Sequence, residues 1–159
     1  MGSTADGGPR PGLVLAAILG GGFMAATFDF FAAMLICHGT ASGVARAVAR
    51  GWYGAGAKTG GQPVDVVGMA SHWGILLVAA AIFVLASLRF PALRRLAWMA
   101  GPLFGACIYG VMHYVVLPLS AVHAVNNPKG LAFAEEFAGH LFVIGLPIAL
   151  WARGLLGRG

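Results

Sequence analysis

Charged residues are scarce in this sequence of 159 residues: they make up 9% of it, as five acidic residues and ten Lys or Arg. A soluble domain carries about a quarter charged residues, because its surface must face water. So few charges cannot solvate a globule of this length, and the mean hydropathy of +0.84 agrees with this. The composition therefore excludes an ordinary soluble domain and predicts a protein that has lipid as part of its solvent.

Several functional motifs are also missing. There is no CxxC and no CxxCH, which excludes c-type haem attachment. There is no Gly-rich phosphate loop, no nucleophilic Ser motif and no soluble domain to carry a substrate pocket. The basic residues lie in short segments between apolar runs and not along one face, which argues against nucleic acid as a partner. We therefore do not expect an enzyme. The two cysteines, Cys37 and Cys107, are expected to pack without forming a disulfide.

Four long apolar runs dominate what is present. They cover about 13–37, 66–88, 96–120 and 131–152, and each is close to the ~20 residues that cross a bilayer core. The first is too long for a signal-peptide core and has no A-x-A cleavage pattern after it. The fold class predicted is all-α, an integral membrane four-helix bundle with 13–152 as its single domain. Residues 1–12, rich in Gly and Pro, are expected to be a disordered tail, and 153–159 a second tail.

The connecting segments carry most of the charge. Over 42–53, Arg46 and Arg50 are four apart while Val44, Val48 and Trp52 lie on another face, which predicts a short helix in the membrane interface. Residues 54–63 read as a flexible linker. Basic residues gather beside the first helix start, the 89–95 connection and the last helix end. By the positive-inside rule both termini are then cytoplasmic and 38–64 is extracytoplasmic, in a bacterial inner membrane.

Small residues and tryptophans give signals about packing. Gly101 and Gly105 are four apart, a spacing that lets helices approach closely in lipid. Trp52, Trp73 and Trp151 fall near the expected membrane interfaces and are interpreted as anchors there.

Ionisable residues inside the apolar runs are the most informative feature, because such groups are costly in hydrocarbon. From the 1.5 Å rise per residue, four of them from four helices lie roughly 10 to 13 Å below the extracytoplasmic ends. Glu136 is four residues before His140 and so shares its helix face. Glu135 is its neighbour. The predicted polar cluster comprises Asp29, His72, His113, Glu136 and His140.

Three interpretations of this cluster stay open. Imidazoles and carboxylates from several helices suit a transition metal such as zinc or iron, and paired histidines could instead bind haem b. The same groups could pass protons, since histidine titrates near neutrality. They could also be interhelical hydrogen-bonding groups with no further role.

The second half of the chain resembles the YagU-like family of small bacterial inner-membrane proteins. The resemblance rests on Ser71-His72, on His113 followed five residues later by Pro118 (HYVVLP), and on EFAGH over 136–140. It covers about 68–151, and the first helix, with Asp29, is less similar. The resemblance implies a four-helix inner-membrane protein in which these histidines and Glu136 form a shared motif. It does not choose among the three interpretations.

The function expected from the sequence is metal, haem or proton handling at the predicted polar cluster, in envelope stress tolerance. Two alternatives stay beside it. One is a non-catalytic accessory subunit whose polar residues only fix helix packing, and the other is an oligomeric transporter of a small solute. The expected partners are the lipid bilayer and either further copies of the chain or a larger membrane complex.

Overall fold

The computed structural model describes all residues except 1–9, 126–127 and 158–159, and every regular element among the described residues is helical. Part of the expected N-terminal tail therefore lies outside the described residues. In chain order the elements are α1 (Pro11–Ile36), α2 (Ala41–Tyr53), the 3-10 helix η1 (Gly54–Thr59), α3 (Gly61–Arg89), α4 (Ala92–Arg95), α5 (Ala97–Val111), the π-helical segment η2 (Met112–Val116), α6 (Leu117–Leu119), α7 (Leu131–Ala138), the π-helical segment η3 (Gly139–Gly145) and α8 (Leu146–Leu156).

The described residues contain four helical stretches long and apolar enough to cross a membrane, which confirms the predicted all-α class and helix number. They are α1, α3, the α5–η2–α6 stretch and the α7–η3–α8 stretch. Helix α1 begins two residues earlier than expected, because Pro11 at its start lacks only an N–H that would have no partner there. The last helix continues to Leu156, so 153–156 are helical instead of part of a tail.

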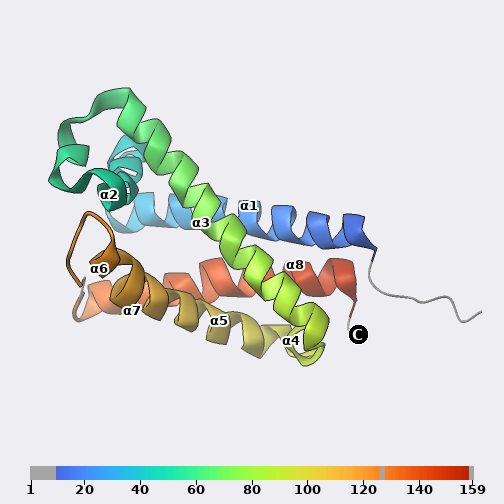
Figure 1. Ribbon diagram of the computed structural model, residues 1–159. Coiled ribbons are helices and arrows are strands. Elements are labelled where there is room, and N and C mark those ends of the chain that lie inside the picture. Colours follow the sequence, from blue (N-terminus) through green and yellow to red (C-terminus); the bar gives the residue numbers. More distant parts are fainter. Residues whose placement is uncertain (1–9, 126–127, 158–159) are drawn as a thin grey trace, which may run out of the picture.

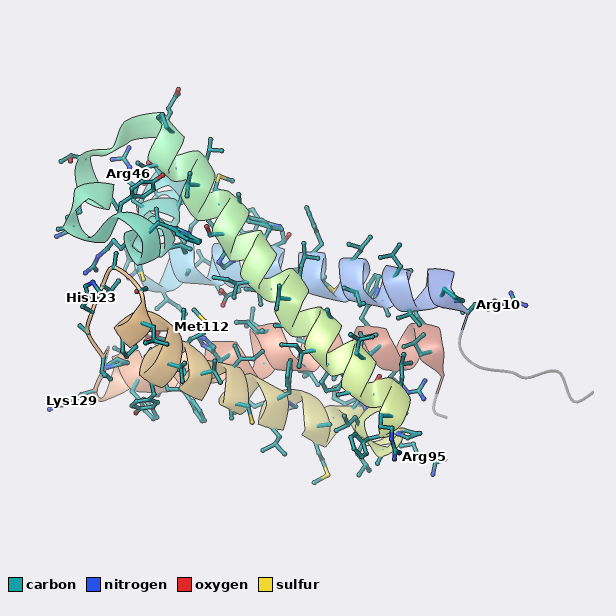
Figure 2. All side chains as sticks on the ribbon, viewed as in Figure 1. Arg10, Arg46, Arg95, Met112, His123 and Lys129 are labelled. Atoms are coloured by element: carbon teal, nitrogen blue, oxygen red, sulfur yellow. The ribbon has the colours of Figure 1, made fainter. Side chains whose placement is uncertain are left out.

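The four stretches pack so that α1 contacts α3 on one side and α8 on the other, while α5 packs against η3 and α8 (Figure 1). One end of the bundle carries α2, η1 and α6, and we call it the α2 end. The other carries α4, the start of α1 and the end of α8, and we call it the α4 end (Figure 1). Side-chain nitrogens mark both ends, as Arg46, His123 and Lys129 at the α2 end and Arg10 and Arg95 at the α4 end show (Figure 2).

Glycine and alanine build the contacts between helices. A Cβ added at Gly105 would collide with the carbonyl oxygen of His140, and one at Gly145 with the carbonyl oxygen of Gly101. On the other side of the bundle, Gly22 of α1 lies against the backbone of Leu77. The core is correspondingly rich in fully buried alanines. Because lipid tails are as apolar as leucine, this close backbone contact is what holds such helices together, and it confirms the role predicted for Gly101 and Gly105.

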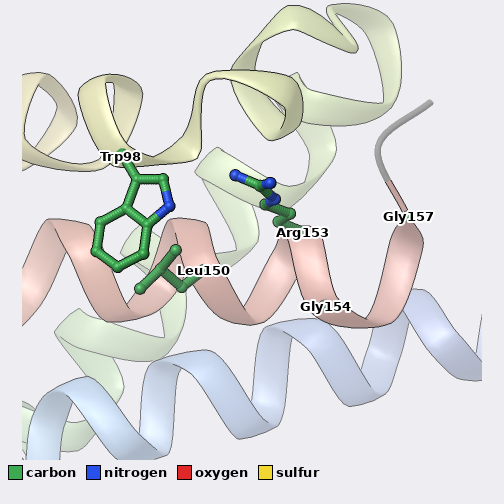
Figure 3. A pocket seen from close by; sticks show the side chains of 5 residues that line it. All are labelled: Trp98, Leu150, Arg153, Gly154 and Gly157. Carbon is green, nitrogen blue, oxygen red and sulfur yellow. The ribbon is translucent and has the colours of Figure 1, made fainter.

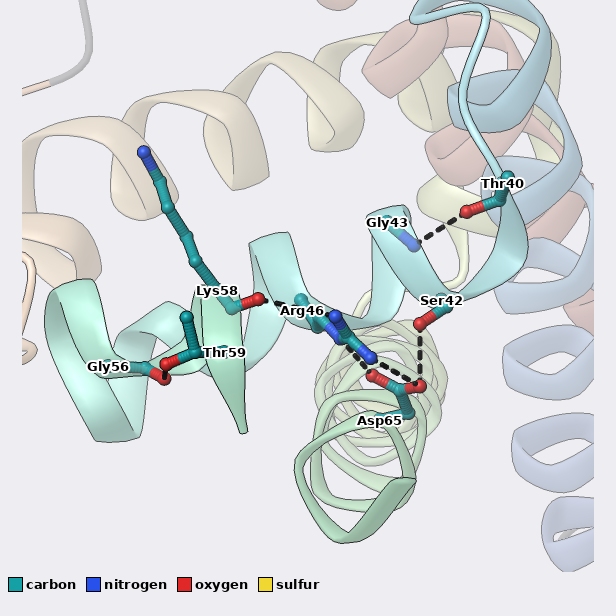
Figure 4. A network of polar contacts seen from close by, with 8 residues as sticks. All are labelled: Thr40, Ser42, Gly43, Arg46, Gly56, Lys58, Thr59 and Asp65. Carbon is teal, nitrogen blue, oxygen red and sulfur yellow. Dashed lines mark hydrogen bonds and ion pairs between the residues drawn. The ribbon is translucent and has the colours of Figure 1, made fainter. Parts of the chain in front are cut away.

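Helix α2 is fixed to the start of α3 by a polar network (Figure 4). The Arg46 Nε donates to Asp65 Oδ1 over 2.6 Å, and the Ser42 hydroxyl donates to Asp65 Oδ2 over 2.6 Å. Arg46 also donates to the Lys58 carbonyl over 3.2 Å, and the Thr40 side chain accepts from the Gly43 N–H at the start of α2. The hydrogen bond that Arg46 donates to the Asp65 carboxylate raises the pKa of Arg46 above its ordinary value.

The short helix expected over 42–53 is present as α2, but the flexible linker expected after it is wrong. Residues 54–59 form the helix η1, and α3 begins at Gly61. The glycines that suggested flexibility instead serve the turns, since Gly54 and Gly61 both have positive φ, at 56° and 66°.

Candidate functional site

The structure brings the five residues of the predicted polar cluster to one level, nearer to the α2 end than to the α4 end. They form two pairs, and each pair comes from one helical hairpin. Asp29 of α1 faces His72 of α3, and His113 of η2 faces Glu136 of α7, with His140 of η3 beside it. Asp29 also interacts electrostatically with His140 and Glu136, so the two pairs act on each other. The residues predicted to share one depth are therefore found as two pairs, and a common functional site for all five stays a prediction.

The first pair is organised by the backbone of α1. The buried His72 ring places Nε2 3.0 Å from the carbonyl oxygen of Ala26 and 3.8 Å from Asp29 Oδ2. A carbonyl oxygen only accepts, so Nε2 carries the proton and donates it to Ala26. Phe30 and Trp73 enclose the ring, with centroids 5.6 and 5.2 Å from it. His72 thus joins α3 to α1.

The second pair is closer, and it joins a buried imidazole to a carboxylate that is 35% exposed. His113 Nδ1 lies 3.0 Å from the carbonyl oxygen of Tyr109, one turn earlier on the same helix, and therefore donates to it. The other ring nitrogen, Nε2, is 3.0 Å from Glu136 Oε1. The His113 side chain is 4% exposed, and Nε2 has no well-aligned hydrogen-bond partner among the described residues. The contact with Glu136 is thus a short ion-pair contact whose angle is not that of a linear hydrogen bond.

Aromatic rings wall this second pair. The Tyr109 ring stacks on His113, with centroids 3.9 Å apart and planes at 25°. It also meets His140 edge to face at 5.2 Å, and Phe133 and Phe137 cover its far side at 5.9 and 5.2 Å. These rings bury the His113 imidazole, while the Glu136 side chain stays 35% exposed.

Both histidines of the second hairpin lie in π-helical segments. The Leu117 N–H bonds to Met112 O and the Leu146 N–H bonds to Leu141 O, five residues back in each case. A proline follows each widened turn, at Pro118 and Pro147. Proline has no N–H to give and its ring pushes away the carbonyl four residues earlier, so the helix loosens there. Such π-helical turns are frequent at functional sites.

His113 and His140 make the same hydrogen bond to the backbone of their own helix. His140 Nδ1 lies 2.8 Å from the carbonyl oxygen of Glu136, four residues earlier, and His113 Nδ1 lies 3.0 Å from that of Tyr109, also four residues earlier. Each ring is thereby held against its own helix as the Nδ1–H donor. Nε2 is left as the nitrogen that can accept or release a proton.

Added protons would lower the electrostatic cost of the cluster. With neutral imidazoles and ionised carboxyls, Asp29 and Glu136 would place two negative charges in the membrane-spanning part of the bundle, which is costly. His113 Nε2 and Glu136 Oε1 would also be two acceptor atoms only 3.0 Å apart. One proton on either atom turns this repulsion into attraction, giving an imidazolium–carboxylate pair or an imidazole–carboxylic acid pair.

The geometry is less suited to a metal ion. Among the described residues, no three His, Cys, Asp or Glu side chains converge as ligands for one ion. His72 Nε2 is a donor to Ala26, and His113 Nε2, the nitrogen that a haem iron would need, faces Glu136. Metal or haem binding by the predicted polar cluster therefore stays a prediction from sequence that these contacts do not favour.

The surroundings of Trp73 and of the cysteines were not predicted from the sequence. Trp73 packs against Phe30 and His72, with its ring N–H buried. Cys37 and Cys107 are free, but both are exposed instead of packed: Cys37 directly follows α1, and Cys107 lies on an exposed side of α5. Glu135 makes no contact comparable to that of Glu136, since it lies on a different side of α7.

Tyr109 belongs to the site although it is not one of the five residues of the predicted polar cluster. It is one turn before His113, so its carbonyl and its ring both reach the imidazole. The signal that could have revealed this was the combination of Tyr109, His113 and Pro118 on one helix, since the proline loosens the turn in which the histidine lies.

Comparison with known proteins adds no relative: no protein-family model, no curated protein and no solved structure matches this chain. The resemblance to the YagU-like family stays a prediction from the sequence, and the argument for function rests on the geometry above.

Proposed function

We propose that this chain is a multi-pass protein of the bacterial inner membrane that binds and releases protons at a His113–Glu136 site within the bilayer. The observation that carries the proposal is the 3.0 Å contact between His113 Nε2 and Glu136 Oε1 while Nδ1 is committed to the Tyr109 carbonyl. That contact is favourable only with a proton on it. With Nδ1 already donating, Nε2 is the ring nitrogen at which an added proton would bind.

The neighbouring groups support uptake from one side. Asp29 adds a second carboxyl within electrostatic range of Glu136 and His140, and all of them lie toward the α2 end. Between the His72 level and Arg94 near the α4 end, no titratable side chain is buried among the described residues. The described residues therefore offer no buried titratable relay from the site toward the α4 end. This favours a proton-binding or pH-sensing site over a conducting path or an oligomeric transporter.

A structural role is the second candidate, and His72 is the observation that favours it. Its Nε2 donates to the Ala26 carbonyl and ties two helices together, as polar groups in membrane bundles often do. If all the polar residues acted in this way, the protein would be an accessory subunit without a titrating site. The two candidates differ in whether Glu136 changes its protonation with pH.

Infrared difference spectroscopy of the protein in lipid, recorded while the pH is stepped, separates them. A carboxyl that takes up a proton in an apolar site gains a carboxylic-acid C=O band at the expense of carboxylate bands. We expect such a band in the wild type and its loss in Glu136→Gln. Glu135→Gln is the matched control, with the same chemical change one residue away, and it should keep the band. A wild type without any pH-dependent carboxyl band, or a band that Glu136→Gln leaves intact, would contradict the proposal.

A further inference from the structure

Two adjoining hollows flank α8 at the α4 end, remote from the proton site. The first has a volume of about 490 Å³ and is lined by Trp98 of α5 and by Leu150, Arg153, Gly154 and Gly157 (Figure 3). The second, of about 450 Å³, lies between α1 and α8 and is lined by Met24, Phe28, Pro147, Leu150, Trp151, Gly154 and Leu155. Leu150 and Gly154 belong to both. A Cβ added at Gly154 would meet nothing within 4 Å, so the surface between the two hollows is open there.

The two hollows differ in chemistry. The first is lined by the guanidinium of Arg153 and the exposed indole of Trp98, whereas the second is lined by apolar side chains and glycine. The second hollow is elongated along α8. From Gly154 to Pro147 it follows α8 for seven residues, roughly 10 Å, away from the α4 end and into the bundle. A polar pocket at the helix end thus continues into an apolar groove that leads toward the middle of the membrane.

The charge of this end is of one sign. The acidic residues that the structure describes, Asp29, Asp65, Glu135 and Glu136, all lie in the half nearer to the α2 end. The α4 end carries arginines, at 10, 89, 94, 95 and 153. Buried Arg94 donates to the Leu156 carbonyl over 2.8 Å and so offsets the negative end of α8, which would otherwise repel an anion. The pocket beside Arg153 is therefore suited to a negatively charged group.

We infer that these hollows bind one anionic phospholipid, with its phosphate at Arg153 and Trp98 and one acyl chain in the groove between α1 and α8. Basic pockets between membrane helices commonly hold phosphate-bearing lipid headgroups, and each basic residue near such a charge contributes about 1 kcal/mol. Trp98 is suited to the headgroup level by its apolar ring and single N–H donor. A free phosphate would contact only Arg153 and would not occupy the apolar groove.

The test is a lipid titration of the purified full-length protein, followed by native mass spectrometry, with phosphatidylglycerol and with phosphatidylcholine of the same acyl chains. We expect the phosphatidylglycerol complex to be the tighter one. Arg153→Gln should weaken it by about fivefold, the factor that corresponds to one basic residue. Arg50→Gln is the charge-matched control at the α2 end and should leave it unchanged.

A second variant tests the groove separately from the charge. Gly154→Leu fills the junction of the two hollows, keeps Arg153 and has room for its side chain on the helix surface. It should weaken phosphatidylglycerol binding at least as much as Arg153→Gln. Equal affinity of the wild type for the two lipids would overturn the inference. So would an unchanged phosphatidylglycerol affinity in Arg153→Gln or in Gly154→Leu, provided that Arg50→Gln behaves as the wild type.

Discussion

At the scale of single residues, the site depends on which nitrogen of each imidazole is committed to the backbone. The Nδ1–H groups of His113 and His140 donate to a carbonyl oxygen of their own helix. His72 instead donates from Nε2 to the Ala26 carbonyl of the neighbouring helix. The first arrangement leaves Nε2 facing other side chains, and the second uses the histidine to join helices. Three histidines at one depth therefore have different roles, and depth alone could not distinguish them.

His72 should accordingly affect stability more than proton binding. We expect His72→Leu to lower the free energy of unfolding by about 1–2 kcal/mol, because the Ala26 hydrogen bond and the ring contacts with Phe30 and Trp73 are lost. The pH-dependent carboxyl band of Glu136 should persist. Unfolding in mixed micelles, followed by circular dichroism, gives the first quantity. Loss of the band with unchanged stability would reverse the roles assigned to the two pairs.

Tyr109 should act through its ring and not through its hydroxyl. Tyr109→Phe keeps the stacked ring on His113 and should change stability by less than about 1 kcal/mol. Tyr109→Leu removes the stacked and edge-to-face pairs, each worth about 0.5–1.5 kcal/mol, and should destabilise the protein by about 2 kcal/mol. The same unfolding measurement checks both variants. Equal losses in the two would show that the hydroxyl carries the effect.

At the scale of helices, the site depends on how closely α5 approaches η3. Gly105 lies directly against the His140 backbone, and this contact sets the distance between the helices that carry His113 and Glu136. The proline-loosened turns then aim the two histidines inward. Both features are local consequences of residue type, glycine in one case and proline in the other.

Gly105 offers a sharp comparison with Gly110 on the same stretch. Gly105→Ala would drive a Cβ into the carbonyl of His140 and should destabilise the protein by about 1–3 kcal/mol. At Gly110 an added Cβ meets nothing within 4 Å, so Gly110→Ala should be neutral or stabilising by up to about 1 kcal/mol. Thermal or denaturant unfolding of both variants measures the difference. A Gly105→Ala protein as stable as Gly110→Ala would show that the contact between α5 and η3 is looser than described.

The sequence predicted the helices and the common depth of the polar residues, because long apolar runs and the helical rise determine both. It did not predict how the polar residues pair. The pairing follows from crossing positions set by Gly22, Gly105 and Gly145, and several arrangements of four helices would keep the same depths. The π-helical turns were also missed, although Pro118 and Pro147 were visible as their cause. The linker after α2 was misjudged because glycines with positive φ build turns as readily as they permit flexibility.

At the scale of the whole molecule, the two ends are chemically distinct. Every described acidic residue lies toward the α2 end, and the α4 end is marked by arginine. At the α2 end the described acidic residues offset the basic residues Arg46, Arg50, Lys58 and Lys129, whereas the α4 end has no described acidic residue. The orientation with both termini in the cytoplasm stays a prediction from the positive-inside rule. The His113–Glu136 contact and the proposed lipid site lie toward opposite ends of the bundle.

The two free cysteines allow the orientation to be measured. Cys37 is exposed just after α1 at the α2 end, and Cys107 is exposed in the middle of a membrane-spanning stretch. A membrane-impermeant maleimide applied to intact spheroplasts should label Cys37 and leave Cys107 unlabelled, and Cys37→Ser should abolish the signal. Labelling of Cys37 only after the membrane is opened would place the α2 end, and with it the proton site, on the cytoplasmic side.

The most direct test of the central claim is nitrogen NMR of the protein in lipid, with ¹⁵N-labelled histidine and His113 assigned through a His113→Gln variant. We predict that Nδ1 of His113 stays protonated across the pH range in which the bundle is folded. Its Nε2 should change state together with the Glu136 carboxyl and lose that transition in Glu136→Gln but not in Glu135→Gln. A His113 ring whose two nitrogens keep one fixed protonation state at every pH, whatever stands at 136, would contradict a proton-binding role and leave the site as a structural contact.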